Sequence, residues 1–314
     1  MEIRNKIRIF VGELTSNGCI MAIKEFMDYL RYERGRSEHT IDSYRRDLEA
    51  FEAYFTSLDA GLTFETLDSD VIRDWMESMM DNGNTATSVN RRLSAVRSFY
   101  RFALSHGKVE HDPAHAVAGP KKRRPLPQYV REDEMSRLLD GQHWGDDYIS
   151  TRTRTILLVF YETGVRVSEL TGLDDSSVDF ARSEIRVTGK GSKQRAIPFG
   201  AELEAVLKSY IRQRDMEIAH RSSPALFLTE KGERVSADTV RKMVKEQLSQ
   251  VCNLKKRSPH VLRHTFATAM LNGGADIESV RKLLGHERLS TTEIYTHTTF
   301  EQLRAAYKKA HPRE

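Results

Sequence analysis

The sequence predicts a mainly α-helical protein with one small β-sheet, divided into two domains. Apolar side chains between residues 23 and 105 recur at three- and four-residue intervals, which is the spacing of amphipathic helices. A proline-rich and strongly basic segment follows at 118–130. Beyond it, two alternating segments at 184–188 and 194–198 interrupt a second series of helical patterns. At 314 residues the chain is long enough for two hydrophobic cores.

The first domain is expected over residues 21–117 as a four-helix bundle. Its helices run from Ile23 to a stop at Gly35, from Ser37 through Phe55, from a cap at Asp68 or Ser69 to Gly83, and from Thr85 to Ser105. Residues 1–20 carry no strong pattern and are interpreted as an N-terminal extension. Because Met21 stands directly before the first helix, an alternative start there is a hypothesis that N-terminal sequencing would test.

The second domain is expected over residues 131–314, after a linker at 118–130. A helix through Ile156 should break at Gly164, so that Arg166 begins a new helix whose exposed N–H groups help to hold an anion. The two alternating segments should form a hairpin with Lys190 at its tip. The remaining elements are helices at 131–139, about 200–214, 236–250, from Pro259, 276–284, a short one carrying Tyr295 and 300–310, with a strand candidate at 225–228.

Composition is that of an ordinary globular protein, with 39% hydrophobic and 30% charged residues. A net charge of +4 and a pI of about 8.9 are compatible with nucleic-acid binding but do not establish it. Cys19 and Cys252 share no motif and are expected to be free thiols in a reducing compartment. No apolar run approaches a membrane span and no signal peptide is visible, so we expect a cytoplasmic protein.

Six residues of the second domain suit one reaction, the attack of a tyrosyl oxygen on a phosphodiester. Two arginines can clamp the non-bridging oxygens and neutralise the charge that builds on phosphorus. Histidine and lysine can move protons to and from the entering and leaving oxygens. A tyrosine, whose pKa is ordinarily about 10, becomes an adequate nucleophile beside such cations. The set consists of Arg166, Lys190, His260, Arg263, His286 and Tyr295, and it requires neither metal nor cofactor.

These residues lie in phrases that resemble the tyrosine recombinase family, and its Xer branch in particular. The phrases are Thr-Gly-Val-Arg-Val-Ser-Glu-Leu from residue 163, His-Val-Leu-Arg-His-Thr-Phe-Ala-Thr from 260, Leu-Leu-Gly-His ending at 286, and Leu-Ser-Thr-Thr-Glu-Ile-Tyr-Thr-His from 289. The resemblance covers the chain from about residue 22 to its end. It implies a SAM-like core-binding domain, a linker that crosses the DNA backbone, and an α+β tyrosine recombinase catalytic domain.

The resemblance also implies roles for the site residues. Tyr295 would form a covalent 3′-phosphotyrosyl intermediate, Arg166 and Arg263 would clamp the phosphate, and Lys190 would protonate the 5′-hydroxyl. His260 would act as general base or proton relay, His286 would hydrogen-bond the phosphate, and Glu169 would orient Arg166 or a neighbouring backbone group. No ATP, metal or other cofactor is implied.

The implied partner is double-stranded DNA, with two protomers on each site and a homo- or hetero-tetramer in the synapse. A second recombinase and a division-associated DNA translocase are possible further partners in the resolution of chromosome dimers at a dif-like site. A mobile-element integrase would look much the same. The helix at 300–310 is expected to dock into a neighbouring protomer, the alternative being that it packs on its own domain.

DNA contacts are expected from basic side chains on the polar faces of the first domain and from the linker. Solvated helix faces are the alternative interpretation for the first group, and a nuclear-localisation patch is the naive interpretation of the second. Phosphate contact is a safer expectation than base recognition, since arginine makes both. The candidates are Arg45, Arg91, Arg92, Arg97, Lys121, Lys122, Arg123 and Arg124.

Other classes of protein fit the sequence less well. His260 and His264 have the spacing of a zinc pair, but Val261 stands where a catalytic glutamate would be needed and no third ligand is obvious. The segment 189–192 lacks the upstream glycine of a nucleotide-binding loop. The sequence has neither the Gly-x-Ser-x-Gly motif of a nucleophile elbow nor a cysteine beside a histidine, so nothing in it suggests acyl transfer. A type IB topoisomerase and a non-catalytic DNA-binding protein remain alternatives, although a protein without catalysis has no chemical need for Tyr295.

Overall fold

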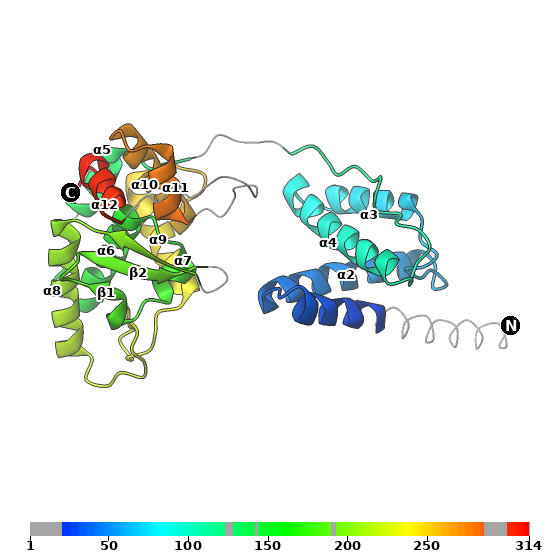
Figure 1. The fold of residues 1–314 in the computed structure, drawn as a ribbon, viewed down its shortest axis with the longest axis horizontal. Helices are drawn as coiled ribbons and strands as arrows, with labels where there is room; N and C mark the ends of the chain where they lie inside the picture. The colour runs from blue at the N-terminus through cyan, green and yellow to red at the C-terminus, as the bar shows by residue number, and fades with distance from the viewer. Residues whose placement is uncertain (1–20, 123–127, 142–143, 190–192, 286–299, 314) are drawn as a thin grey trace. The chain divides into compact units, whose positions relative to one another are not determined.

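The computed structural model describes residues 21–122, 128–141, 144–189, 193–285 and 300–313. It confirms a mainly helical chain with one small antiparallel sheet (Figure 1). The chain divides into two compact units, Met1–Pro125 and Leu126–Glu314, and the division falls inside the segment expected to be the linker. Within the described ranges, every helix is too short or too polar to cross a lipid bilayer.

The first unit contains the four expected helices. The first is described from Met21 onward and continues into the π-helical turn η1 (Tyr29–Glu33); the others are α2 (Glu38–Leu58), α3 (Ser69–Asp81) and α4 (Ala86–Ser105). Side-chain oxygens of Ser37, Asp68 and Thr85 accept from backbone N–H groups at their starts. Asp68, rather than Ser69, is therefore the cap of the third helix.

Aromatic side chains fill the core between these helices. Phe26, Phe51 and Phe99 are almost fully buried, and Phe64 from the α2–α3 connection packs against two of them with ring centroids 4.5 Å from Phe99 and 6.3 Å from Phe51. Burying one such side chain stabilises a fold by roughly 1.5–3 kcal/mol. The connection is further tied down because the hydroxyl of Tyr100 donates to the carbonyl of Phe64.

Each end of the predicted linker belongs to one unit. The amide of Asn90 donates to the carbonyl of Pro120 (2.8 Å), which holds the start of the segment on α4. The N–H of Val130 donates to the hydroxyl of Thr265 (2.9 Å), which fixes the other end to the second unit. Residues 123–127, including Arg123 and Arg124, lie outside the described residues.

The second unit surrounds α6 (Tyr148–Thr163), most of which is buried. Its amphipathic neighbours are packed against it or against one another, as predicted from their apolar spacing. They are α5 (Glu132–Leu139), α7 (Val167–Thr171), α8 (Ala201–Glu217), α9 (Ala237–Val251), α10 (Pro259–Asn272), α11 (Ile277–Leu284) and α12 (Phe300–Ala310).

The sheet consists of β1 (Val178–Asp179), β2 (Glu184–Thr188) and β3 (Gln194–Pro198), all antiparallel and in that order. The predicted hairpin is confirmed, with Ile185 opposite Ile197. Its tip, including Lys190, lies outside the described residues. The two-residue strand β1, which follows the 3₁₀ turn η2 (Asp175–Ser177), was not predicted because it is too short to show a periodicity.

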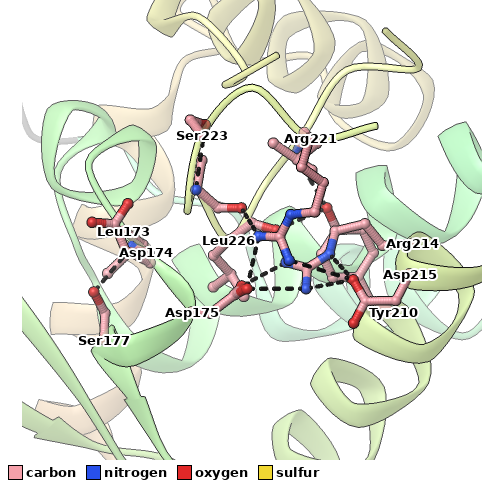
Figure 2. A network of polar contacts seen from close by, with 12 residues as sticks. Leu173, Asp174, Asp175, Ser177, Tyr210, Arg214, Asp215, Arg221, Ser223 and Leu226 are labelled. Carbon is pink, nitrogen blue, oxygen red and sulfur yellow. Dashed lines mark hydrogen bonds and ion pairs between the residues drawn. The ribbon is translucent and has the colours of Figure 1, made fainter. Parts of the chain in front are cut away.

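The prediction of a strand at 225–228 is wrong. Ala225 and Leu228 each make one isolated bridge, to Asp174 and Arg234, and the segment joins no sheet. Its residues are buried because a network around Arg214 holds the 218–235 connection onto α8 (Figure 2). The buried Arg214 donates to the carboxylate of Asp175 and to the carbonyl of Leu226. Arg214 and isolated backbone pairs, such as Leu226 N–H to the carbonyl of Leu173, thus satisfy this backbone without a strand.

The C-terminal helix α12 packs on its own unit in this structure. Tyr307 is fully buried and its hydroxyl donates to Glu162 of α6 (3.1 Å). Beyond the helix, His311 packs its ring against Tyr161, and Arg313 pairs with Glu202 and with Asp140. Docking of α12 into a neighbouring protomer stays a prediction, and would require these contacts to be re-formed between chains.

Glu162 should make the stability of the second unit pH-dependent. Burial raises the pKa of Glu162 to about 8, against the lowering effect of donors at Gly200 and Tyr307, and its Oε1 has no partner among the described residues. Since the folded pKa exceeds the unfolded value, this contribution is fully present below the unfolded pKa and is lost as pH rises through about 8. Between these limits the loss approaches about 1.4 kcal/mol per pH unit.

Thermal and urea unfolding of the wild type and of Glu162→Gln between pH 5 and 9 would measure this dependence. The unfolding free energy of the wild type should fall relative to that of Glu162→Gln as pH rises, because glutamine does not ionise. In Tyr307→Phe, which lacks one donor to the carboxylate, the change should move to higher pH. Parallel stability curves for the wild type and Glu162→Gln would contradict the assignment.

Candidate active site

Arg166 is placed by the end of α6. Gly164 closes that helix with φ 59°, and a Cβ there would lie 2.4 Å from a ring carbon of Phe266, so the position requires glycine on both conformational and steric grounds. The chain turns sharply and Arg166 becomes the N-cap of α7, as predicted. Its own N–H, one of the groups expected to be available for an anion, donates to Glu169 (2.8 Å).

The carboxylate of Glu169 contacts Arg166, the residue that it is expected to orient. Glu169 is buried; its Oε1 accepts from Arg166 Nη1 (2.8 Å) and its Oε2 accepts from the Arg166 N–H. Burial raises the pKa of Glu169, but the hydrogen bonds and charge of Arg195, together with the donors of Arg166, outweigh it and hold the pKa at about 2. The carboxylate is therefore ionised at neutral pH.

Arg263 reaches the same region from α10. It is buried, and it donates to the carbonyls of Gly164 (2.8 Å) and Leu284 (2.5 Å). Burial and the nearby charge of Arg166 lower the pKa of Arg263 to about 10, which still leaves the guanidinium charged at neutral pH. Arg166 also donates to the carbonyl of Gly285 (3.1 Å). Two cations are thus held close to each other, an arrangement that favours an anion between them.

His260 lies one turn before Arg263 on α10, as predicted, and is exposed. Partial burial of its ring lowers the pKa of His260, and neighbouring basic groups, chiefly His264 and Arg263, lower it further. The imidazole is therefore neutral at neutral pH and can accept a proton. The rings of His260 and His264 are 4.5 Å apart, and in the described ranges no third His, Cys, Asp or Glu joins them to form a metal-binding group.

A cavity of about 650 Å³ opens beside Arg166. Basic side chains from β3 and α11 contribute to its wall, so that an anionic ligand would be favoured. Its lining consists of Arg166, Ser168, Glu169, Thr188, Gly189, Lys193, Gln194, Arg195, Lys282 and Gly285. Three further predicted catalytic residues, Lys190, His286 and Tyr295, lie outside the described residues, although Gly189 and Gly285 directly precede the first two.

In the first unit, two of the predicted DNA-contacting arginines share a buried carboxylate. Arg91 pairs with both oxygens of Asp47 and also donates to Ser43 (2.8 Å). Arg92 approaches the same carboxylate at 3.9 Å. Asp47 was missed by the sequence analysis, although a charged residue inside the apolar stripe of a helix is a signal that could have indicated it.

The other DNA-binding candidates differ in whether their side chains are exposed or already bonded within the protein. Arg97 donates to the carbonyls of Ala114 and Val117, so it holds the segment after α4. Arg45 is exposed and pairs with Asp42 and Glu49 on its own helix. Lys121 and Lys122 are exposed. The structure thus gives Arg97 a local structural task, while the contact of all these residues with DNA remains a prediction.

Comparison with known proteins agrees with this arrangement. The phage integrase family model matches residues 128–302, and the model of the phage integrase N-terminal SAM-like domain matches residues 23–107. The chain is 38% identical to tyrosine recombinase XerC of Chlorobaculum tepidum, over 92% of this chain and 94% of that protein. It is 40% identical to tyrosine recombinase XerC of Mycobacterium sp. (strain KMS), over 92% of this chain and 97% of that protein.

Two solved structures share the fold. One is XerH recombinase bound to a palindromic difH substrate, with a TM-score of 0.69 and 20% identity over 96% of this chain and 88% of that one. The other is the Tn1549 transposon integrase in complex with transposon right end DNA, with a TM-score of 0.70 and 18% identity over 92% of this chain and 98% of that one.

The helical bundle, the α+β domain and the paired arginines define the class of tyrosine recombinases, enzymes that cut and rejoin DNA. The chain belongs to the phage integrase family and is a site-specific tyrosine recombinase of the Xer type.

Proposed function

We propose that the chain exchanges DNA strands with Tyr295 as its nucleophile. The tyrosyl oxygen attacks the scissile phosphorus, the bond to the 5′-oxygen breaks, and a 3′-phosphotyrosyl linkage forms. His260 takes the proton of Tyr295, and Lys190 gives a proton to the departing 5′-oxygen. Attack by the 5′-hydroxyl of a partner strand reverses these steps, so the energy of the phosphodiester is kept in the linkage and no ATP is consumed.

The observation that carries this proposal is the paired clamp of Arg166 and Arg263. Both guanidinium groups are held by protein oxygens before any substrate arrives, Arg166 on Glu169 and Arg263 on two carbonyls. Such preorganised donors stabilise the charge that develops on a pentavalent phosphate and require no reorganisation during the reaction. His286 would add a further hydrogen bond to the phosphate.

The neutral state of His260 supports its role as a base. A protonated imidazole could not accept the proton of Tyr295, and partial burial, aided by the cationic surroundings, keeps the pKa of His260 below its ordinary value. The same positive surroundings favour the phenolate form of an approaching tyrosine. The same positive electrostatic environment thus serves both the proposed base, His260, and the phosphate clamp of Arg166 and Arg263.

The biological setting that we propose is the resolution of chromosome dimers at a dif-like site. The relatives named XerC support it, and the XerH structure shows that a related fold binds difH DNA. Two protomers would occupy each site and four would form the synapse, as a homo-tetramer or with a second recombinase, under the control of a DNA translocase at division. Arg45, Arg91, Arg92 and the linker cations Lys121–Arg124 would contact phosphates.

Integration of a mobile element by the same chemistry is the second candidate, favoured by the likeness of fold to the Tn1549 integrase. A plasmid assay separates the possibilities. Two directly repeated dif-like sites from the host should be resolved into two circles by the purified protein, alone or with a second host recombinase. Relaxation of supercoils without resolution would instead indicate a topoisomerase, and exchange only at the ends of a mobile element would favour the integrase.

A further inference from the structure

Arg195 of β3 lies at the centre of the candidate active site. The sequence analysis did not single it out, because its contacts lie 26 and 88 positions away in the chain. Its Nη1 and Nη2 donate to the two oxygens of Glu169 (2.8 and 2.9 Å), and its Nε donates to the carbonyl of Leu283 (2.8 Å). Each of the three guanidinium nitrogens therefore donates a hydrogen bond, and the side chain is only 15% exposed.

The last turn of α11 shows what this placement achieves. The carbonyls of three successive residues, Leu283, Leu284 and Gly285, accept from three different arginines. The donors are Arg195 Nε, Arg263 Nη2 and Arg166 Nη2, in that order. These carbonyls form the negative end of the helix dipole, so they attract cations and orient them at the same time. The C-terminal end of α11 thus fixes the positions of three guanidinium groups.

The charges at Glu169 show why a third arginine is needed. Arg166 and Glu169 alone would form a neutral pair, in which the carboxylate competes with a phosphate for the guanidinium. With Arg195 as a second partner, two guanidinium groups and one carboxylate leave one net positive charge. The positive field of Arg166 is thereby kept for the substrate, while Glu169 still fixes its direction.

We propose that Arg195 is a positioning residue for strand cleavage, which neutralises Glu169 and fixes Arg166 against the end of α11. It does not touch the phosphate itself. Gly285 is packed against it, because a Cβ at that position would lie 3.1 Å from Arg195 Nη1. This inference rests on the proposed function, since it assumes that Arg166 binds the scissile phosphate.

The test compares Arg195→Met and Arg195→Lys with the wild type on a nicked suicide substrate. Arg195→Met should form the covalent adduct roughly 10- to 100-fold more slowly, because a misplaced clamp acts on the transition state. Its Kd for the same DNA should stay within about threefold, since the clamp of one phosphate is a small part of the interface. Arg195→Lys keeps the positive charge but loses the branched guanidinium group, so its rate of adduct formation should lie between those of the wild type and Arg195→Met.

The decisive variant is the double substitution Arg195→Met with Glu169→Gln. Removing the carboxylate charge frees Arg166 from an uncompensated competitor, so the double variant should cleave faster than Arg195→Met alone. A residue that merely supports packing would give losses that add. A double variant that is no faster than Arg195→Met, or a loss confined to DNA affinity, would overturn the proposal.

Arg234→Met is the matched control. Arg234 also donates to two carbonyls, of Thr171 and Leu173, and to one carboxylate, of Asp174, but it contacts none of the site residues in the described ranges. Its adduct formation should equal that of the wild type once thermal unfolding has shown that all variants are folded. If the wild type itself forms no Tyr295-dependent adduct, the proposed function fails; if it does and Arg195→Met matches it, only the role of Arg195 fails.

Discussion

Tyr295→Phe should abolish the covalent protein–DNA adduct while leaving DNA binding intact. The substitution removes the one oxygen that is proposed to attack the phosphorus, and a phenylalanine ring offers no nucleophile in its place. A nicked duplex with a host dif-like site traps the adduct, because the fragment that carries the 5′-hydroxyl diffuses away. Denaturing electrophoresis should show a DNA-linked band for the wild type and none for the variant, with equal Kd values in a mobility-shift assay.

Tyr129→Phe is the control for that experiment. Tyr129 belongs to the same unit and its side chain is exposed, so loss of its hydroxyl should leave the adduct unchanged. A DNA-linked band that persists in Tyr295→Phe would mean that another tyrosine is the nucleophile. Absence of the band from the wild type, despite specific binding, would mean that cleavage requires a second recombinase.

Replacing Arg263 should have the second largest effect. Arg263→Met removes one half of the phosphate clamp and should lower the rate of adduct formation by about 10²- to 10³-fold, the usual loss for one transition-state donor. It also leaves the carbonyls of Gly164 and Leu284 without their donor, which costs about 1–3 kcal/mol for each buried group. A fall in both activity and thermal stability is therefore expected.

The two losses can be separated with further variants. Arg263→Lys keeps a positive charge but cannot reach both carbonyls and a phosphate, so it should recover part of the stability and little of the rate. Arg152→Met removes another buried arginine, which donates to the carbonyl of Leu228 from α6. The Arg152→Met variant should be less stable than the wild type, but its folded fraction should cleave DNA at the wild-type rate. Equal rates for Arg263→Met and Arg152→Met at matched stability would contradict a catalytic role for Arg263.

Local structure was largely predictable from the sequence. The helical periodicity, the helix starts at Ser37 and Thr85 and the stop at Gly164 depend on contacts between near neighbours in the chain, and the structure confirms them. The hairpin of β2 and β3 is local in the same sense. The order of the recombinase phrases likewise determined the family without reference to any distance.

Only the tertiary structure decided how the charged groups are used. Periodicity shows which face of an element is buried, but not which polar group that face meets. The apolar run at 225–228 fits a strand, yet its backbone is satisfied by Arg214 and by isolated bridges. Arg97 has the spacing of a surface residue, yet it holds two carbonyls of the following loop.

The same limit explains why Arg195 was missed. Its role depends on β3, α7 and the end of α11 meeting at one point, and no pattern within a single segment carries that information. The sequence by itself determined most of the elements, the family and the candidate residues, because these follow from short-range chemistry. Which arginine donates to which of the three successive carbonyls was decided by packing between distant segments, since hydrogen bonds of buried charges require partners at fixed positions in space.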